Sequence, residues 1–271
     1  MKLKKILGVS ALAGTMLFNS CSTFAAPTED KETINQIALL QSLTLGHFQG
    51  SVTIKQLKTL GDTGIGTFDG LNGELIMLDG VVYQGNQECL AKILDEETTI
   101  PFSNVTFFEK DFSVNLKDID EKALLEDKLN QVVAENGANS FYMIKLPGEF
   151  NEILIRSEAK QAEPYPTLVQ ALQATQNEAT LKNIRGTIVG LYCPSYMGGL
   201  NSVGWHFHFI SKDKLQAGHV LGLNLKKGTA LLDKTDNFAL HLPDNKDFQG
   251  LNLGQDLSKD IRKAEVDKVN R

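Results

Sequence analysis

The sequence predicts an α/β fold with more strand than helix, in which a mixed β-sheet N-terminal part packs against a second β-rich part. Three observations predict this fold. Short apolar stretches with the period of a strand, bounded by glycine turns, outnumber those with the period of a helix. Residues 118–136 and 167–177 have helical apolar spacing. The 271 residues, 42% hydrophobic and 22% charged, suffice for one large domain or two small ones.

Residues 1–26 have the layout of a bacterial secretory signal peptide. Three lysines within the first five residues form a basic head, and an apolar core follows over residues 6–18. Small residues then lead to a cleavage site near Ala25 or Ala26. The apolar core is too short to span a membrane as a mature helix. We therefore expect a secreted, extracytoplasmic protein with no stable membrane span.

Cysteine and charge limit the remaining possibilities. A lipid anchor at Cys21 is an alternative to secretion, although residues 18–20 are a poor lipoprotein box. Cys89 and Cys193 would remain in the mature chain as one disulfide or as two buried free thiols, and neither has the spacing of a metal knuckle. The net charge is −6 and no lysine or arginine patch stands out. This charge distribution is compatible with both an enzyme and a binding protein, but it argues against a nucleic-acid partner.

The N-terminal part is expected over residues 34–160, after a flexible linker at 27–33. It opens with a strand that passes into a short helix over 34–43. Thr53 is a suitable N-cap for a second short helix that Gly61 ends. The remaining elements are strands rich in β-formers and one amphipathic helix. They are predicted at 64–68, 74–78, 81–84, 105–108, 118–136 (the helix), 141–146 and 152–156, the last two as a hairpin around Pro147-Gly148.

The C-terminal β-rich part is expected over residues 161–271. A helix over 167–177 follows Pro164 and Pro166, and five strands come after it. These strands are predicted at 187–192, 205–210, 219–225, 229–233 and 237–242. The tail over 257–269 is charged with thin apolar periodicity, which is compatible with a terminal helix or an extended arm.

Three of the five histidines fall in one stretch of fourteen residues, which belongs to the C-terminal part. On a strand, His206 and His208 point to one face, while Trp205, Phe207 and Phe209 point to the other. Residues 211–217 are polar and predict a surface connection to an antiparallel strand. If Ile210 pairs with His219, the third imidazole faces the same side as the first two.

Three neutral imidazoles on one face predict a metal site with open positions for water or substrate. Such a site is catalytic rather than structural. Zinc is the default metal for imidazole ligands in an oxidising compartment, while iron, copper and manganese stay open. The competing interpretation, three unrelated histidines, fits this spacing poorly.

From about Leu39 to its end, the chain resembles the alpha-acetolactate decarboxylase family. The resemblance is carried by short motifs spread along the chain, of which the histidine segment is the most specific. They are Gly61-Asp62-Thr63-Gly64-Ile65-Gly66-Thr67-Phe68, Leu71-Asn72-Gly73-Glu74-Leu75-Ile76, Asp79-Gly80-Val81-Val82-Tyr83-Gln84, Arg156, Cys193-Pro194-Ser195-Tyr196, Gly204-Trp205-His206-Phe207-His208-Phe209-Ile210 and Gly218-His219-Val220. The family usually has Asp in place of Asn72 and Tyr in place of Trp205, and neither change touches a ligand.

The resemblance implies site residues at matching positions. They are His206, His208 and His219 as zinc ligands, Glu74, Arg156 and Glu265 as catalytic residues, and Thr67 with Arg156 as substrate-binding residues. It also implies zinc-dependent decarboxylation of 2-acetolactate to acetoin and CO2, through a metal-stabilised enediolate that an active-site glutamate protonates. A homodimer is implied as well. Taken alone, Glu74, Thr67, Arg156 and Glu265 would be ordinary strand or surface residues.

Two other functions compete with this one. A cupin-like metal oxygenase or hydrolase would use the same paired histidines, but that family usually places a glutamate a few residues later, and residues 209–213 contain none. A secreted zinc-binding protein without catalysis would need a closed four-ligand site.

Overall fold

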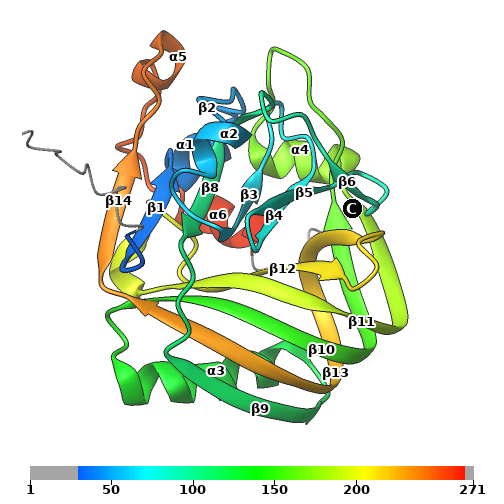
Figure 1. Cartoon of the computed structure of the whole chain (residues 1–271). Coiled ribbons are helices and arrows are strands. Elements are labelled where there is room, and N and C mark those ends of the chain that lie inside the picture. The colour runs from blue at the N-terminus through cyan, green and yellow to red at the C-terminus, as the bar shows by residue number, and fades with distance from the viewer. Residues whose placement is uncertain (1–29, 266–271) are drawn as a thin grey trace, which may run out of the picture.

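The computed structural model describes residues 30–265, which form two β-sheets that face each other (Figure 1). The first sheet has seven strands, and only its β1–β14 pair is parallel. Its order is β14 (Asn237–His241), β1 (Thr33–Ile37), β8 (Phe102–Thr106), β3 (Thr63–Thr67), β4 (Glu74–Leu78), β5 (Val81–Gly85) and β6 (Ala91–Ile93). The predicted mixed sheet is confirmed. The predicted signal peptide, with Cys21, lies outside the described residues.

The second sheet has five long antiparallel strands. Its order is β10 (Phe141–Ser157), β11 (Asn177–Cys193), β12 (Gly204–Ser211), β13 (Ala217–Thr235) and β9 (Phe112–Ile119). β13 pairs with β12 at its start and with β10 along most of its length, so the pairings close into a ring. Each sheet draws strands from both sides of residue 160, and the division of the chain there stays a prediction.

Six helices and a two-stranded ribbon of β2 (Val52–Thr53) and β7 (Thr99–Ile100) accompany the two sheets in the described residues. The helices are α1 (Leu40–Thr44), α2 (Ile54–Leu57), α3 (Lys122–Asn136), α4 (Leu168–Thr175), α5 (Lys246–Gln249) and α6 (Ser258–Glu265), with a 3-10 turn at Ser195–Met197. The α/β prediction with more strand than helix is confirmed. Within residues 30–265, every helix is too short or too polar to cross a membrane.

Side-chain caps fix the start of two predicted helices. Thr53 accepts a hydrogen bond from the Gln56 amide and begins α2, and Thr167 accepts one from Gln170 and begins α4. In both, the glutamine side chain returns a bond to the cap backbone, which satisfies amides that a helix leaves free. The predicted helix over 118–136 begins only at Lys122, because the residues up to Ile119 belong to β9.

The hairpin predicted around Pro147-Gly148 is wrong. β10 runs unbroken through both residues, with Gly148 directly opposite Gly186 on β11 and Gly228 on β13. Three aligned glycines let the three strands bend together where one strand alone would have turned back. A Cβ on Gly186 would lie 2.3 Å from the Phe209 ring, so this bend also admits a core aromatic residue.

Replacing Gly186 with alanine is expected to lower the free energy of unfolding by about 1–3 kcal/mol, because the new methyl overlaps both the Phe209 ring and the Ile210 carbonyl. Gly222→Ala on β13 is the matched control, since its nearest atom would be 3.9 Å away. Urea denaturation of both variants measures the difference. Equal stability of the two variants would contradict this account of the bend.

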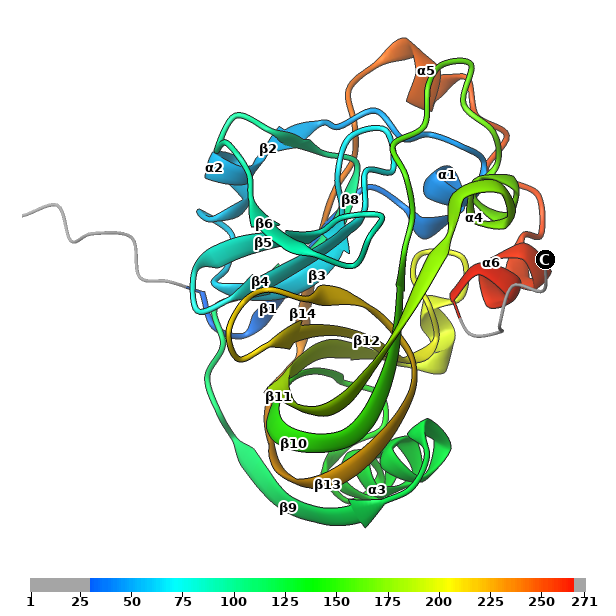
Figure 2. The ribbon, with the colours of Figure 1, turned by 90° about the vertical axis from the view of Figure 1, so that its right-hand side faces the viewer.

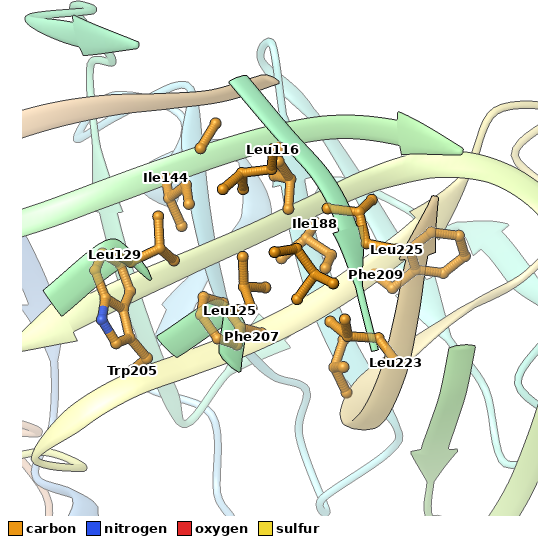
Figure 3. Packing of buried hydrophobic residues seen from close by; sticks show 14 of the residues in the cluster. Leu116, Leu125, Leu129, Ile144, Ile188, Trp205, Phe207, Phe209, Leu223 and Leu225 are labelled. Atoms are coloured by element: carbon orange, nitrogen blue, oxygen red, sulfur yellow. The ribbon is translucent and has the colours of Figure 1, made fainter. Parts of the chain in front are cut away.

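The main core lies between the second sheet and α3 (Figure 3). Leu125 and Leu129 of α3 pack against Trp205, Phe207 and Phe209 of β12, all of them buried. Strand alternation therefore turns His206 and His208 to the opposite face, toward the first sheet, as predicted.

The register between β12 and β13 differs from the prediction by two residues. His208, not Ile210, lies opposite His219, and Ile210 lies opposite Ala217. A tight connection accounts for the difference, since the Ser211 amide donates to the Gln216 carbonyl. A shift of two residues preserves the face of every side chain. The predicted side of His219 is therefore correct.

Helices α1, α4 and α6 gather on one side of the molecule, where the two sheets meet (Figure 2). Leu43 of α1, Leu172 of α4 and Ile261 of α6 belong to one buried apolar cluster. The C-terminal tail is thus a docked helix over Ser258–Glu265, and residues from 266 onward are outside the described part. Cys89 and Cys193 are buried free thiols, which decides between the two predicted states.

Candidate active site

Neighbouring strands of the second sheet align three functional side chains. Arg156 on β10 lies opposite His219 on β13, and His219 lies opposite His208 on β12. Residues directly opposite each other share a face of the sheet. His206 shares that face because it is two residues from His208. The backbone register alone therefore collects one guanidinium and three imidazoles on the face turned toward the first sheet.

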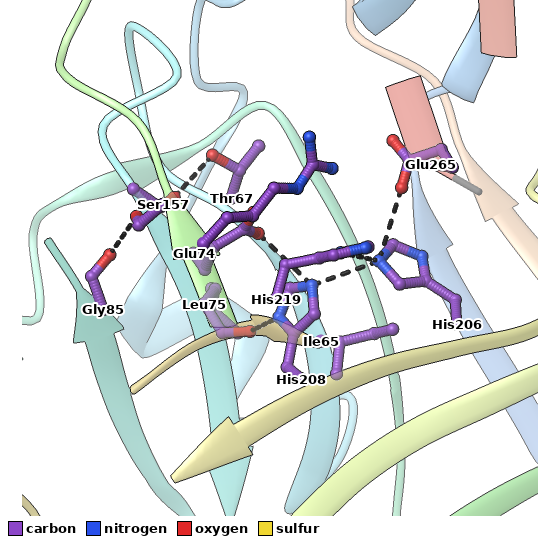
Figure 4. A network of polar contacts seen from close by, with 12 residues as sticks. Ile65, Thr67, Glu74, Leu75, Gly85, Ser157, His206, His208, His219 and Glu265 are labelled. Atoms are coloured by element: carbon purple, nitrogen blue, oxygen red, sulfur yellow. Dashed lines mark hydrogen bonds and ion pairs between the residues drawn. The ribbon is translucent and has the colours of Figure 1, made fainter. Parts of the chain in front are cut away.

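The three imidazoles converge on one point (Figure 4). The Nε2 atom of His206 lies 3.1 Å from Nε2 of His208 and 3.0 Å from Nδ1 of His219. The Nδ1 atom of His208 is 2.8 Å from the Leu75 carbonyl oxygen, so that it can donate there and leave Nε2 as an acceptor. The Nε2 atom of His219 is buried without a partner among the described residues.

Two glutamates reach this cluster from other elements (Figure 4). Glu74 opens β4 of the first sheet, and its Oε2 lies 3.2 Å from Nε2 of His208. Glu265 ends α6, and its Oε2 lies 3.4 Å from Nε2 of His206. An imidazole lone pair and a carboxylate oxygen are both acceptors, so contacts this short require a proton or a cation between them.

Thr67 on β3 lies opposite Glu74, so both side chains face the second sheet. The Thr67 hydroxyl donates to the Gly73 carbonyl at 2.8 Å. Its oxygen remains available to accept a hydrogen bond. The structure thus brings together all seven residues that the resemblance singled out.

Arg156 is buried beneath this cluster and is held by two hydrogen bonds. Its Nη1 donates to Gln176 Oε1 at 3.0 Å, and its Nη2 donates to the Ala264 carbonyl at 2.7 Å. Because Ala264 precedes Glu265, the second bond fixes the end of α6 that presents this glutamate. The Nε of Arg156 has no partner among residues 30–265.

Burial shifts the pKa values of the whole cluster toward the neutral forms. Desolvation by burial, followed by the charge of Arg156, lowers the pKa of His206 to about 3. Burial likewise holds the pKa values of His208 and His219 well below the ordinary value. The pKa of Glu74 is raised by burial and by a neighbouring carboxyl group, and that of Glu265 by burial. The imidazoles are therefore neutral near pH 7, the form that binds metal ions.

Two polar residues of the site were not predicted from the sequence. Glu158 is 2% exposed and lines the same cavity as Glu74 and Arg156. Gln176, which follows α4, receives the Arg156 hydrogen bond. The position of Glu158 could have been predicted, because it stands two residues after Arg156 and residues two apart in an extended chain point to the same side. Nothing in the sequence around Gln176 indicates its role.

The cavity between these groups is small, with a volume of about 30 Å³, enough for one or two water molecules. One wall is polar and contains the residues described above. An apolar wall is formed by Leu43, Leu71, Phe102, Leu168 and Leu172. Helices α1 and α4 supply Leu43, Leu168 and Leu172 of this wall, and α6 supplies Glu265.

The donor set fits a divalent metal ion. The three ligand nitrogens lie within 4.8 Å of one another, and nitrogens that share a zinc ion at about 2.0–2.1 Å would be about 3.3 Å apart. The cavity holds the carboxyl groups of Glu74, Glu158 and Glu265 but only the guanidinium of Arg156. Three carboxyl groups thus face one guanidinium, so the cavity can balance the charge of a divalent cation.

Comparison with known proteins shows which family the sequence of this chain matches. The sequence profile described as "Alpha-acetolactate decarboxylase" matches residues 34–255. The alpha-acetolactate decarboxylase of Methanosarcina mazei is 39% identical over 86% of this chain and 80% of that protein. That of Brevibacillus brevis is 33% identical over 90% of this chain and 85% of that protein.

Solved structures agree with the sequence matches. The crystal structure of alpha-acetolactate decarboxylase from Bacillus subtilis strain 168 has a TM-score of 0.83, with 32% identity over 87% of this chain and 100% of that one. A Staphylococcus aureus protein described as similar to alpha-acetolactate decarboxylase has a TM-score of 0.80, with 29% identity over 86% of this chain and 100% of that one. The profile and the relatives each cover most of the chain, and so the chain belongs to the alpha-acetolactate decarboxylase family.

Proposed function

We propose that this protein decarboxylates 2-acetolactate to acetoin and CO2 with a zinc ion held by His206, His208 and His219. The observation that carries the proposal is the convergence of three neutral imidazoles with a buried arginine and buried carboxyl groups in one cavity. 2-Acetolactate carries a carboxylate, a tertiary hydroxyl and a ketone on adjacent carbons. His206, His208 and His219 would hold the zinc, which would act as a Lewis acid for the negative charge that develops on the substrate.

Arg156 orients the anionic end of the substrate. Two of its nitrogens are already fixed by Gln176 and Ala264, so the guanidinium plane cannot rotate. Its Nε–H and the second N–H of each Nη remain as donors for the substrate carboxylate or for the negative charge that follows CO2 loss. A donor fixed before the reaction stabilises charge without reorganisation in the transition state.

A buried glutamic acid delivers the proton. When CO2 leaves, the bonding electron pair stays on the substrate carbon, and one proton must be added to form acetoin. Burial raises the pKa of both Glu74 and Glu265, which favours the protonated form that a proton donor needs. Glu74 comes from strand β4 and Glu265 from helix α6. Each would therefore reach a single face of the substrate carbon and give one enantiomer of acetoin.

Thr67 and the apolar wall position the rest of the substrate. The Thr67 oxygen can accept a hydrogen bond from the substrate hydroxyl, since its own proton is donated to Gly73. Phe102 and the four leucines of the wall fit the two methyl groups and exclude water from the reacting carbon. Export of the mature chain and the homodimer, which rest on the N-terminal pattern and the resemblance, stay predictions.

Removal of the metal tests this proposal. A strong chelator, followed by gel filtration, is expected to lower acetoin formation from 2-acetolactate at least about 100-fold, since a metal contributes several kcal/mol of charge stabilisation. One equivalent of Zn²⁺ per chain is expected to restore it. Acetoin, CO2 and bound zinc are measured on the same samples. Full activity in metal-free protein would exclude the metal from the mechanism, and zinc-loaded protein that forms no acetoin would refute the decarboxylase function.

A further inference from the structure

The side chain of Gln176 bonds two charged residues at once. Gln176 is 3% exposed and caps the end of α4, just before β11. Its Oε1 accepts a hydrogen bond from Arg156 Nη1 at 3.0 Å, and its Nε2 donates one to Glu178 Oε1 at 2.9 Å. Glu178 is exposed and lies directly opposite Arg156 on the neighbouring strand. The buried guanidinium is thus connected to a carboxyl group at the surface through one amide.

These two hydrogen bonds can run in one direction only. A guanidinium has donors and no acceptor, while a carboxylate has acceptors and no donor. The Gln176 amide must therefore turn its oxygen to Arg156 and its nitrogen to Glu178. In the flipped amide, the nitrogen would meet the donors of Arg156 and the oxygen would meet the carboxylate, so both bonds would be lost.

The contact with Glu178 fixes the end of a flexible side chain. Glutamine has three side-chain torsions, and a bond to Arg156 alone would leave them only partly restrained. A second bond on the other side of the amide holds its plane. An amide held in this way can in turn hold the guanidinium, which has one other anchor, the Ala264 carbonyl at 2.7 Å from Nη2.

Arg156 needs both anchors to keep its orientation. Bonds to Nη1 and Nη2 together fix the plane of the guanidinium, whereas a single bond would leave it free to turn about that contact. Groups that meet a substrate need such fixing, because small errors in their position lower the rate strongly.

We propose, on the basis of the proposed function, that Glu178 is a positioning residue that anchors the Gln176 amide and through it the plane of the Arg156 guanidinium. Glu178 itself lies outside the set of residues that line the cavity, so it touches neither the substrate nor the metal ligands in this role. Its effect passes through Gln176. Its removal therefore leaves zinc binding intact and lowers the rate at which the anionic substrate reacts.

Two substitutions of Glu178 separate this hydrogen bond from the shape of the side chain. Glu178→Leu removes the acceptor at similar volume, and we expect kcat/KM about 3–10-fold lower, the size that one hydrogen bond contributes. Glu178→Gln keeps an oxygen that accepts from Gln176 Nε2, so we expect kcat/KM within about two-fold of wild type. Glu152, an exposed glutamate on β10, is the matched control, and neither Glu152→Leu nor Glu152→Gln should change kcat/KM.

A double-mutant cycle tests whether the effect passes through the amide. Glu178→Leu is combined with Gln176→Leu, and we expect the double variant to have the kcat/KM of Gln176→Leu alone, because the anchor has nothing left to hold. Zinc content and Tm of each variant are measured beside the kinetics. If Gln176→Leu does not fold, the comparison of Glu178→Leu with Glu178→Gln still decides the question, since Glu178 is exposed.

Wild-type kcat/KM in Glu178→Leu would overturn the inference, as would an equal loss in Glu178→Gln. A further loss in the double variant as large as that in Glu178→Leu alone would also overturn it, because Glu178 would then act by another route. Zinc-loaded wild-type protein that forms no acetoin would instead refute the proposed function, and this role with it.

Discussion

Replacing His208 with alanine is expected to remove both the bound zinc and the decarboxylase activity. His208 is 1% exposed, and its Nδ1 is anchored by the Leu75 carbonyl, so its Nε2 has one fixed direction. No other imidazole within residues 30–265 can take its place, because His47 and His241 lie outside the cavity. Loss of charge stabilisation worth several kcal/mol corresponds to an activity at least about 100-fold lower, the same loss as expected on removal of the metal.

His241→Ala is the matched control for this prediction. His241 also contacts a single polar partner, Asn35 Oδ1 at 3.0 Å, but it lies on β14 at the edge of the first sheet. We expect this variant to keep one zinc per chain and wild-type kcat/KM. The double variant His206→Ala, His208→Ala should bind no zinc. A folded double variant that still forms acetoin at the wild-type rate would contradict the metal site.

The histidine cluster was the most predictable part of the site, because it depends only on strand alternation. His206 and His208 share a face in any strand, whatever its partner. The register with His219 was predicted two residues away from its actual position, and the face was still correct. An error of one residue would have turned His219 into the core with Phe209. The prediction therefore depended only on whether the register error was an even or an odd number of residues, and not on the exact pairing.

The bend of the second sheet was not predictable from local sequence. Pro147-Gly148 has the composition of a turn, and in isolation a turn is the better interpretation. Strand β10 bends at this point but does not turn back, because Gly186 and Gly228 stand opposite Gly148 on the two neighbouring strands. These glycines are about 40 residues apart along the chain, and only the folded sheet aligns them.

The contribution of Glu158 and Gln176 depends on tertiary packing. Glu158 lines the cavity together with Glu74, which comes from the other sheet. Gln176 matters because α4 ends beside the Arg156 guanidinium. Glu265, which the resemblance proposed by spacing alone, lies at the end of α6, where buried Ile261 and Ala264 fix which side of the helix faces inward. Its role stays a prediction.

Replacing Arg156 with lysine is expected to lower kcat/KM about 100–1000-fold, although the charge is kept. Lysine is a point charge on a flexible stem and cannot bond Gln176, the Ala264 carbonyl and the substrate in one plane. The loss has two parts, because the Ala264 bond also fixes the end of α6 and thereby places Glu265 near His206. One missing donor in a charge-stabilising site typically costs about 10²–10³ in kcat.

Gln176→Leu separates these two parts. It removes the Nη1 partner of Arg156, together with the Gln176–Glu178 hydrogen bond, and leaves the bond to Ala264. We therefore expect a smaller loss of kcat/KM than in Arg156→Lys and an unchanged position of Glu265. Arg185→Lys, an exposed arginine on β11, controls for the substitution itself. Steady-state kinetics and a crystal structure of each variant make the comparison. If Arg156→Lys kept wild-type kcat/KM, charge alone would be sufficient at this position, and the fixed guanidinium would have no part in orienting either the substrate or α6.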